Sequence, residues 1–214
     1  TTLVTGTPTA QAADTVQTTP TALTKKSKQK WTQTKKAGRK AMRAALKDTQ
    51  ATSASVALVS GGKTVWSRTF GRVNTAGKKP SDTTKFGIGS VGKMVTTTAV
   101  MQLVDAGRIS LDAPVVQYVP DFSMKSPQYR QITVRMLLNH SAGLPGTDYA
   151  DSISSQPIPS YVDGVLAGLA NSHLKTTPGA MNVYCNDCFT LAGVVVERVS
   201  GMPFHDYVKR NILR

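Results

Sequence analysis

The stretch Phe86-Gly-Ile-Gly-Ser-Val-Gly-Lys93 decides the fold, because it opens an apolar helix that continues to Asp105. Residues three apart share one face of a helix, so the Ser90 hydroxyl and the Lys93 amine should point into the same space. Serine is a weak nucleophile until a base takes its proton, and burial can lower the pKa of a lysine enough for that task. The first turn of a helix also offers unpaired N–H groups to a developing oxyanion. We therefore predict that Ser90 is a nucleophile with Lys93 as its base.

The Ser-x-x-Lys spacing is not specific by itself, because the chain contains it four times, beginning at Ser27, Ser60, Ser90 and Ser172. Ser27 lies in a lysine-rich polar tract, Ser60 in a Gly-Gly turn, and Ser172 in a polar stretch ahead of Pro178. Ser90 alone follows a short apolar run and opens a helix with apolar periodicity. The alternative role for Ser90 is to cap the helix, which is what serine does most often at that position.

The charge of the 214-residue chain is strongly positive, with 26 Lys and Arg against 12 Asp and Glu and a formal net charge of +14. Residues 1–50 hold ten of the basic residues and two Asp. We expect the basic arm within residues 1–37 to attract polyanions such as an anionic cell-wall polymer. Trp31 is its only aromatic residue, which argues against a stacking surface for specific nucleic-acid binding.

Residues 1–37 are predicted to be an export-signal remnant followed by a disordered basic arm. Ala10-Gln-Ala12 has the small-x-small pattern that ends a secretory signal, although a disordered Thr- and Ala-rich terminus would look the same. No stretch approaches the roughly 18 apolar residues that a membrane span requires. We therefore expect a protein that is secreted or held at the cell envelope.

Two strands are predicted at residues 53–59 and 63–71, joined through Ser60-Gly-Gly62 as a hairpin. Residues 72–85 are predicted to be loop, and the Gly- and Pro-rich residues 143–159 to be a lid or a surface connection. Pro178-Gly179 marks a turn. Apolar periodicity predicts helices over residues 38–49, 94–105, 109–120, 132–140, 161–170, 189–200 and 204–213, with Asp112 and Thr133 as caps.

A second group of candidate residues is Tyr184-Cys-Asn186, which precedes the helix at residues 189–200. A nearby lysine ammonium would favour the phenolate of Tyr184, which could then relay a proton between Ser90 and a leaving group. Asn186 could donate a hydrogen bond to a substrate amide carbonyl. The alternative for Tyr184 is a half-buried aromatic residue with a satisfied hydroxyl.

Four blocks in this order resemble the serine β-lactamase-related family, closest to its class C β-lactamase and D-alanyl-D-alanine carboxypeptidase branch. They are Lys85-Phe-Gly-Ile-Gly-Ser-Val-Gly-Lys-Met94, Leu111-Asp-Ala-Pro-Val115, Ile132-Thr-Val-Arg-Met-Leu-Leu-Asn-His-Ser-Ala-Gly-Leu-Pro145, and the block from Pro178-Gly179 to Val199-Ser-Gly201. The resemblance covers residues from about Ser53 to the end.

The resemblance implies an α+β fold of the β-lactamase/transpeptidase type, with a helical domain beside an antiparallel sheet that is incomplete in this chain. The hydrolase domain would occupy residues 38–214. Ser90 would attack an amide or ester carbonyl, and Lys93 and Tyr184 would manage the protons. Such enzymes use no metal and no cofactor. The implied substrates are peptidoglycan stem peptides ending in D-alanine, β-lactams or small esters.

The family's third motif, Lys-Thr-Gly or His-x-Gly, is absent from these 214 residues. Its strand supplies one wall of the site and an oxyanion donor, whose loss typically costs about a hundredfold to a thousandfold in rate. We therefore expect low activity from this chain alone, and a complementing C-terminal segment or chain. A catalytically incomplete penicillin-binding or sensor module is the competing function, and a small-ester esterase is another.

Cys185 and Cys188 are the only cysteines, and they flank the Asn of the second group. A thioredoxin-like redox pair would need a βαβ context that the sequence does not show. The remaining alternatives are a local disulfide that braces the Tyr184 loop, favoured in an exported protein, and two free thiols. A structural zinc site is not expected from two cysteines without an adjacent histidine.

Overall fold

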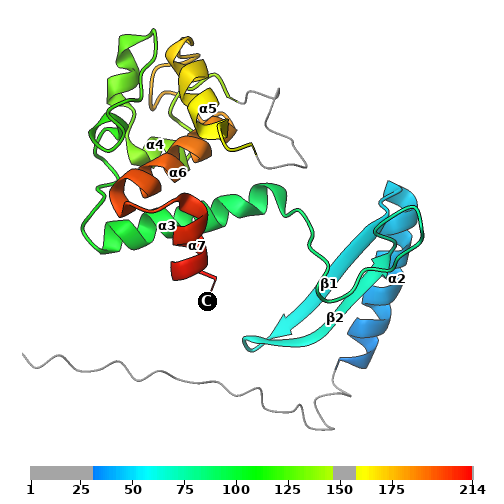
Figure 1. The fold of residues 1–214 in the computed structure, drawn as a ribbon. Coiled ribbons are helices and arrows are strands. Elements are labelled where there is room, and N and C mark those ends of the chain that lie inside the picture. Colours follow the sequence, from blue (N-terminus) through cyan, green and yellow to red (C-terminus); the bar gives the residue numbers. More distant parts are fainter. Residues whose placement is uncertain (1–30, 147–157, 214) are drawn as a thin grey trace, which may run out of the picture. The chain divides into compact units, whose positions relative to one another are not determined.

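The computed structural model describes residues 31–146 and 158–213, which form two compact units that divide between Gly87 and Ile88 (Figure 1). The predictions for residues 1–30, including the export-signal remnant and most of the basic arm, lie outside the described residues. So does most of the lid or connection expected at residues 143–159, because residues 147–157 are not described.

The first unit contains the predicted hairpin, in which β1 (Ser53–Ser60) pairs antiparallel with β2 (Lys63–Gly71). The register runs from Ser53 opposite Gly71 to Ser60 opposite Lys63, with an irregularity between Leu58 and Val59. The turn residues Gly61 and Gly62 both have positive φ, at 57° and 71°. Two consecutive left-handed residues match the twist of a tight hairpin, and glycine adopts them without strain.

Helix α2 (Thr32–Thr49) packs against the hairpin and begins six residues before the predicted start. The prediction of a disordered arm through residue 37 is therefore wrong for residues 32–37, which are helical. The composition of this segment is polar. Its half-buried positions nevertheless lie on the same face of the helix as those of the later turns, and packing of this face extends the helix toward its N-terminus. These positions are Lys35, Gly38, Arg39, Met42 and Leu46.

Helix α6 (Asn186–Ser200) is the centre of the second unit and contacts α3, α4, α5 and α7 (Figure 1). It is apolar around most of its circumference, as expected for a helix enclosed by others. The flanking helices are α3 (Gly92–Asp105), α4 (Val134–Leu138), α5 (Tyr161–Ala170) and α7 (Phe204–Asn211). Fully buried side chains of α6 and α3 that form the core include Leu191, Val194, Val195, Val196, Ala99 and Val100.

Two further predicted helices are shorter than expected. The segment 109–120 keeps only the 3₁₀ turn η2 (Val115–Gln117), and η3 (Pro127–Gln131) precedes α4. Thr133 caps α4 as predicted, because its hydroxyl accepts the N–H of Met136 at 3.3 Å. Asp112 is not a cap, since its carboxylate instead accepts two hydrogen bonds from the Arg135 guanidinium, at 2.7 and 2.8 Å.

No helix within residues 31–146 and 158–213 combines the length and the apolar character that crossing a membrane would need.

Candidate active site

Ser90 lies in the 3₁₀ turn η1 (Gly89–Val91), immediately before α3. Gly89 has a φ of 51°, so a left-handed residue directs the chain into this turn. The Ser90 hydroxyl does not cap either helix, because neither η1 nor α3 receives a side-chain cap hydrogen bond. The alternative capping role for Ser90 is therefore not realised. Its Oγ instead accepts a hydrogen bond from Lys93 Nζ at 3.2 Å.

Tyr184 and Asn186 complete the arrangement from the start of α6. The Tyr184 hydroxyl forms a short hydrogen bond with Ser90 Oγ. Lys93 Nζ donates to Asn186 Oδ1 at 2.5 Å and lies 4.7 Å from the centre of the Tyr184 ring. The structure thus brings together all four residues proposed for catalysis and substrate binding, and all four belong to the second unit.

The electrostatics of the cluster favour the ionised phenol. The Lys93 ammonium, followed by the Ser90 hydroxyl, lowers the pKa of Tyr184 from its ordinary value. Lys93 is held by acceptors on two sides, Ser90 Oγ and Asn186 Oδ1. Such an arrangement can remove the proton from Ser90 through Tyr184, with Lys93 supplying positive charge.

Cys185 and Cys188 form a disulfide in the first turn of α6, and both are buried. Cys185 Sγ also accepts the N–H of Cys188 at 3.0 Å, so the sulfur takes the place of an N-cap oxygen. Because Cys185 lies between Tyr184 and Asn186, the disulfide ties the chain that carries both side chains to the helix.

His140 was not among the predicted site residues, although it contacts Tyr184 closely. Its Nδ1 accepts the N–H of Cys185 at 3.1 Å, and its carbonyl accepts the N–H of Val183 at 2.9 Å. The imidazole lies 4.8 Å from the Tyr184 ring and 5.2 Å from the Phe189 ring, between ring centres. No sequence spacing signals this contact. The nearest clue is that the histidine lies within one of the four blocks that resemble the family, the block at residues 132–145.

The pKa of His140 is lowered, first by burial and then by the positive charge of Lys93. The Cys185 N–H bond requires an unprotonated Nδ1, which agrees with a neutral imidazole. The backbone of His140 is left-handed, with a φ of 64°. This conformation is uncommon for a residue other than glycine, and the two hydrogen bonds to the Tyr184 loop hold it.

A cavity of about 310 Å³ adjoins the cluster within the second unit. Lys93 and Asn186 form part of its wall, and apolar side chains from three helices form much of the remainder. The cavity can therefore accept an apolar group of a molecule whose polar part lies at the cluster. These apolar residues are Val162, Phe189, Val194 and Phe204.

The sequence of the chain is similar to those of known proteins over most of its length. Residues 39–214 match the family model described as Beta-lactamase. The chain is 29% identical over 164 residues to "Protein flp" of Staphylococcus aureus (strain COL), covering 75% of this chain and 32% of that protein.

The fold is also found in solved structures of similar proteins. The octameric penicillin-binding protein homologue from Pyrococcus abyssi superposes with a TM-score of 0.70 at 28% identity, over 82% of this chain and 41% of that one. The β-lactamase/D-alanine carboxypeptidase from Pseudomonas syringae gives a TM-score of 0.67 at 23% identity, over 82% and 47%. These likenesses agree with the expected α+β fold of the β-lactamase/transpeptidase type.

The chain spans about a third of the length of the curated relatives that it matches. The family model nevertheless covers most of the chain, including Ser90, Lys93, Tyr184 and Asn186. The chain therefore belongs to the Beta-lactamase family.

Proposed function

We propose that this chain carries the acylating centre of a serine hydrolase that acts on D-Ala-D-Ala peptides or β-lactams through an acyl-serine intermediate. The observation that carries this proposal is that Ser90 Oγ bonds to both Lys93 Nζ and the Tyr184 hydroxyl. An alcohol between an ammonium and a phenol of lowered pKa is arranged for deprotonation.

In the proposed reaction, the Tyr184 phenolate takes the proton of Ser90 as Oγ bonds to the substrate carbonyl carbon. The Lys93 ammonium stabilises the negative charge on the phenolate and the developing oxyanion. Tyr184 then returns its proton to the leaving amine as the amide bond breaks. A water molecule repeats the sequence at the acyl-serine ester, which releases the acid and restores Ser90.

Asn186 has a separate role in this proposal. Its Oδ1 accepts from Lys93, so the other end of the side chain, Nδ2, carries the hydrogen-bond donors. We assign those donors to the substrate amide carbonyl. The adjacent cavity of about 310 Å³ would receive an apolar part of the acyl group.

A second candidate is a penicillin-binding module that acylates without turnover. Residues 1–214 contain no Lys-Thr-Gly or His-x-Gly motif. Without the oxyanion donor that this motif supplies, turnover should fall by about a hundredfold to a thousandfold. Under this proposal, residues outside the 214 supply the motif, and adding them raises turnover. An esterase acting on small esters is the third candidate.

We also propose an extracytoplasmic location, secreted or at the cell envelope. Disulfides persist in oxidising compartments, and the Cys185–Cys188 bond supports this assignment. The net charge of +14 supports an anionic cell-wall polymer as a partner.

The test of the proposed function is covalent labelling with a fluorescent penicillin, measured beside nitrocefin hydrolysis and D-alanine release from a D-Ala-D-Ala peptide. Wild-type chain should label, and Ser90→Ala should not. Ser172→Ala is the matched control, because Ser172 also belongs to a Ser-x-x-Lys pattern. Labelling that persists in Ser90→Ala would refute the assignment. Labelling without turnover would favour the penicillin-binding module.

A further inference from the structure

The positive charge of the protein is concentrated in the first unit. Residues 31–87 hold 12 Lys and Arg against two Asp, a formal net charge of +10. Residues 88–214 hold ten Lys and Arg against nine Asp and Glu. The unit that holds the reacting residues is therefore almost neutral, and the polycationic character belongs to α2, the hairpin and the loop that follows it.

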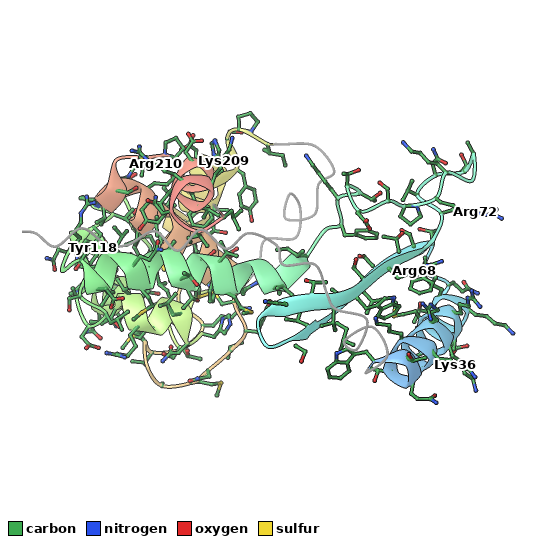
Figure 2. The ribbon with its side chains drawn as sticks, turned by 90° about the horizontal axis from the view of Figure 1, so that it is seen from below. Lys36, Arg68, Arg72, Tyr118, Lys209 and Arg210 are labelled. Atoms are coloured by element: carbon green, nitrogen blue, oxygen red, sulfur yellow. A yellow bond between two sulfur atoms is a disulfide. The ribbon has the colours of Figure 1, made fainter. Side chains whose placement is uncertain are left out.

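A groove of about 520 Å³ within the first unit gathers four of these cations. Arg39 and Arg43 line it from α2, Arg68 from β2, and Lys79 from the following loop. Arg39 also lies over the Trp66 ring, with its guanidinium carbon 5.7 Å from the ring centre. Figure 2 labels Lys36, Arg68 and Arg72 among the cationic side chains of the same unit. Side chains from three segments thus surround one polar hollow.

The cations of the groove are not neutralised by carboxylates in the described part of the chain. Asp82 is the one acidic residue in the groove lining, and it forms no ion pair with any described residue. The ion pairs among residues 31–146 and 158–213 all lie in the second unit. A concave site with several unpaired cations attracts and concentrates a multiply charged anion.

The chemistry of the groove suits phosphate, and it favours a polymer over a membrane. Three of its four cations are arginines, whose planar forks fit phosphate oxygens in pairs. Helix α2 contributes no large exposed apolar side chain that could enter a bilayer. The groove also lacks a free aromatic platform for bases, since Phe70 is half-buried and Arg39 covers Trp66.

We propose that this groove binds a phosphodiester-linked polymer without bases, through Arg39, Arg43, Arg68 and Lys79. The anionic polymer proposed above as a partner would then bind at this groove in the folded first unit, and not at the basic arm of residues 1–37. Binding there needs no chemistry at Ser90, so it stands or falls independently of the acyl-serine reaction.

The test compares two triple variants of the full chain with equal loss of charge. Arg39→Gln/Arg43→Gln/Arg68→Gln changes the groove, and Arg130→Gln/Lys209→Gln/Arg210→Gln changes the second unit, where Figure 2 shows Lys209 and Arg210 on α7. The probe is a short synthetic poly(glycerol phosphate), titrated at several salt concentrations. The groove variant should bind at least roughly tenfold more weakly at low salt and lose about two units of the log-log salt slope. The control variant should keep both values.

Equal weakening in the two variants would overturn the proposal, because it would show diffuse attraction without a site. Equally tight binding of poly-L-glutamate, oligo(dT) or phosphatidylglycerol vesicles would also overturn it, by removing the selectivity for a base-free phosphodiester chain. Penicillin labelling of Ser90 should be unchanged in the groove variant. This control separates failure of the groove from failure of the proposed function. An unchanged far-UV circular dichroism spectrum and thermal unfolding curve show that the first unit of the variant is folded.

Discussion

His140 holds Tyr184 through both of the peptide groups that flank it. The N–H of Val183 bonds to the His140 carbonyl at 2.9 Å, and the N–H of Cys185 bonds to His140 Nδ1 at 3.1 Å. The phenol therefore reaches Ser90 from a segment that is fixed on each side of Tyr184. The position of a residue proposed for proton transfer depends on a histidine 44 residues earlier in the chain.

His140→Asn and His140→Gly should separate the hydrogen bond from the backbone conformation, because both replacements tolerate a left-handed φ. The asparagine variant retains an acceptor for the Cys185 N–H and should acylate at nearly the wild-type rate. The glycine variant leaves that N–H without its partner, at a cost of about 1–3 kcal/mol, which corresponds to about fivefold to 150-fold slower acylation when the cost falls on the transition state. Stopped-flow labelling with a fluorescent penicillin measures both rates. Equal rates in the two variants would contradict a positioning role.

The same histidine should make the fold sensitive to acid. Its pKa is lowered in the folded state, so below the unfolded value near 6.5 the unfolded chain binds the proton more readily. Stability should be fully present above that value and decline as the pH falls through the folded pKa. Urea titrations at successive pH values measure the decline. His140→Asn should flatten the pH profile in this range, and an unchanged profile would argue against the assignment.

Tyr184→Phe should reduce the acylation rate by about a hundredfold to ten-thousandfold, the usual contribution of a general acid–base group. The ring and its contact with His140 stay in place, so only the hydroxyl is lost. Tyr118→Phe is the matched control, because the Tyr118 hydroxyl accepts the Ser110 N–H away from the cluster. The rate should change little in that control. Comparable losses in both variants would show a general effect on folding.

Lys93→Met should shift the pH dependence of acylation as well as its rate. Lys93 is the leading cause of the lowered Tyr184 pKa, so its removal should raise that pKa toward the ordinary value. The phenolate, and with it the rate, should then appear only at higher pH. A pH–rate profile of penicillin labelling gives the midpoint of this limb for each protein. A midpoint that does not move would separate Lys93 from the ionisation of Tyr184.

Reduction of the Cys185–Cys188 disulfide should slow acylation by more than the small loop-closure contribution of this short ring would predict. A ring this short contributes about 2 kcal/mol of loop-closure entropy in the chain-entropy model. The bond also fixes the segment that carries Tyr184 and Asn186, so the labelling rate should fall on treatment with a phosphine reductant. Cys185→Ser/Cys188→Ser should start at the lower rate and show no response to the reductant. A response in that variant would point to another cause.

The local elements of the fold were largely predictable from the sequence. The Gly-Gly turn and alternating strands indicated the hairpin, and the apolar periodicity of residues 161–170 gave the bounds of α5. Helix α6 begins three residues before its predicted start, because the Cys185 sulfur supplies the cap that apolar periodicity does not reveal. The early start of α2 depends on packing against the hairpin, which no local pattern records.

The candidate site was predictable only where its residues are close in sequence. Ser90 and Lys93 were linked by helical spacing, and Tyr184 and Asn186 by their place before a helix. His140 reaches the cluster through tertiary structure alone. Asp112 was assigned to a cap because of its position, but a bidentate ion pair with Arg135 is the stronger interaction for its carboxylate.

Because the backbone at Gly89 is left-handed, the handedness of the residue at position 89 matters more than the size of its side chain. No atom lies within 4 Å of the point where a Cβ would be, so a methyl group fits, yet the φ of 51° is costly for an L-residue. A semisynthetic protein with D-alanine at this position should therefore keep its nucleophile in place, whereas the L-enantiomer should displace it. The mirror-image pair, identical in composition, would show how much of the reactivity of Ser90 comes from the handedness of one neighbouring residue.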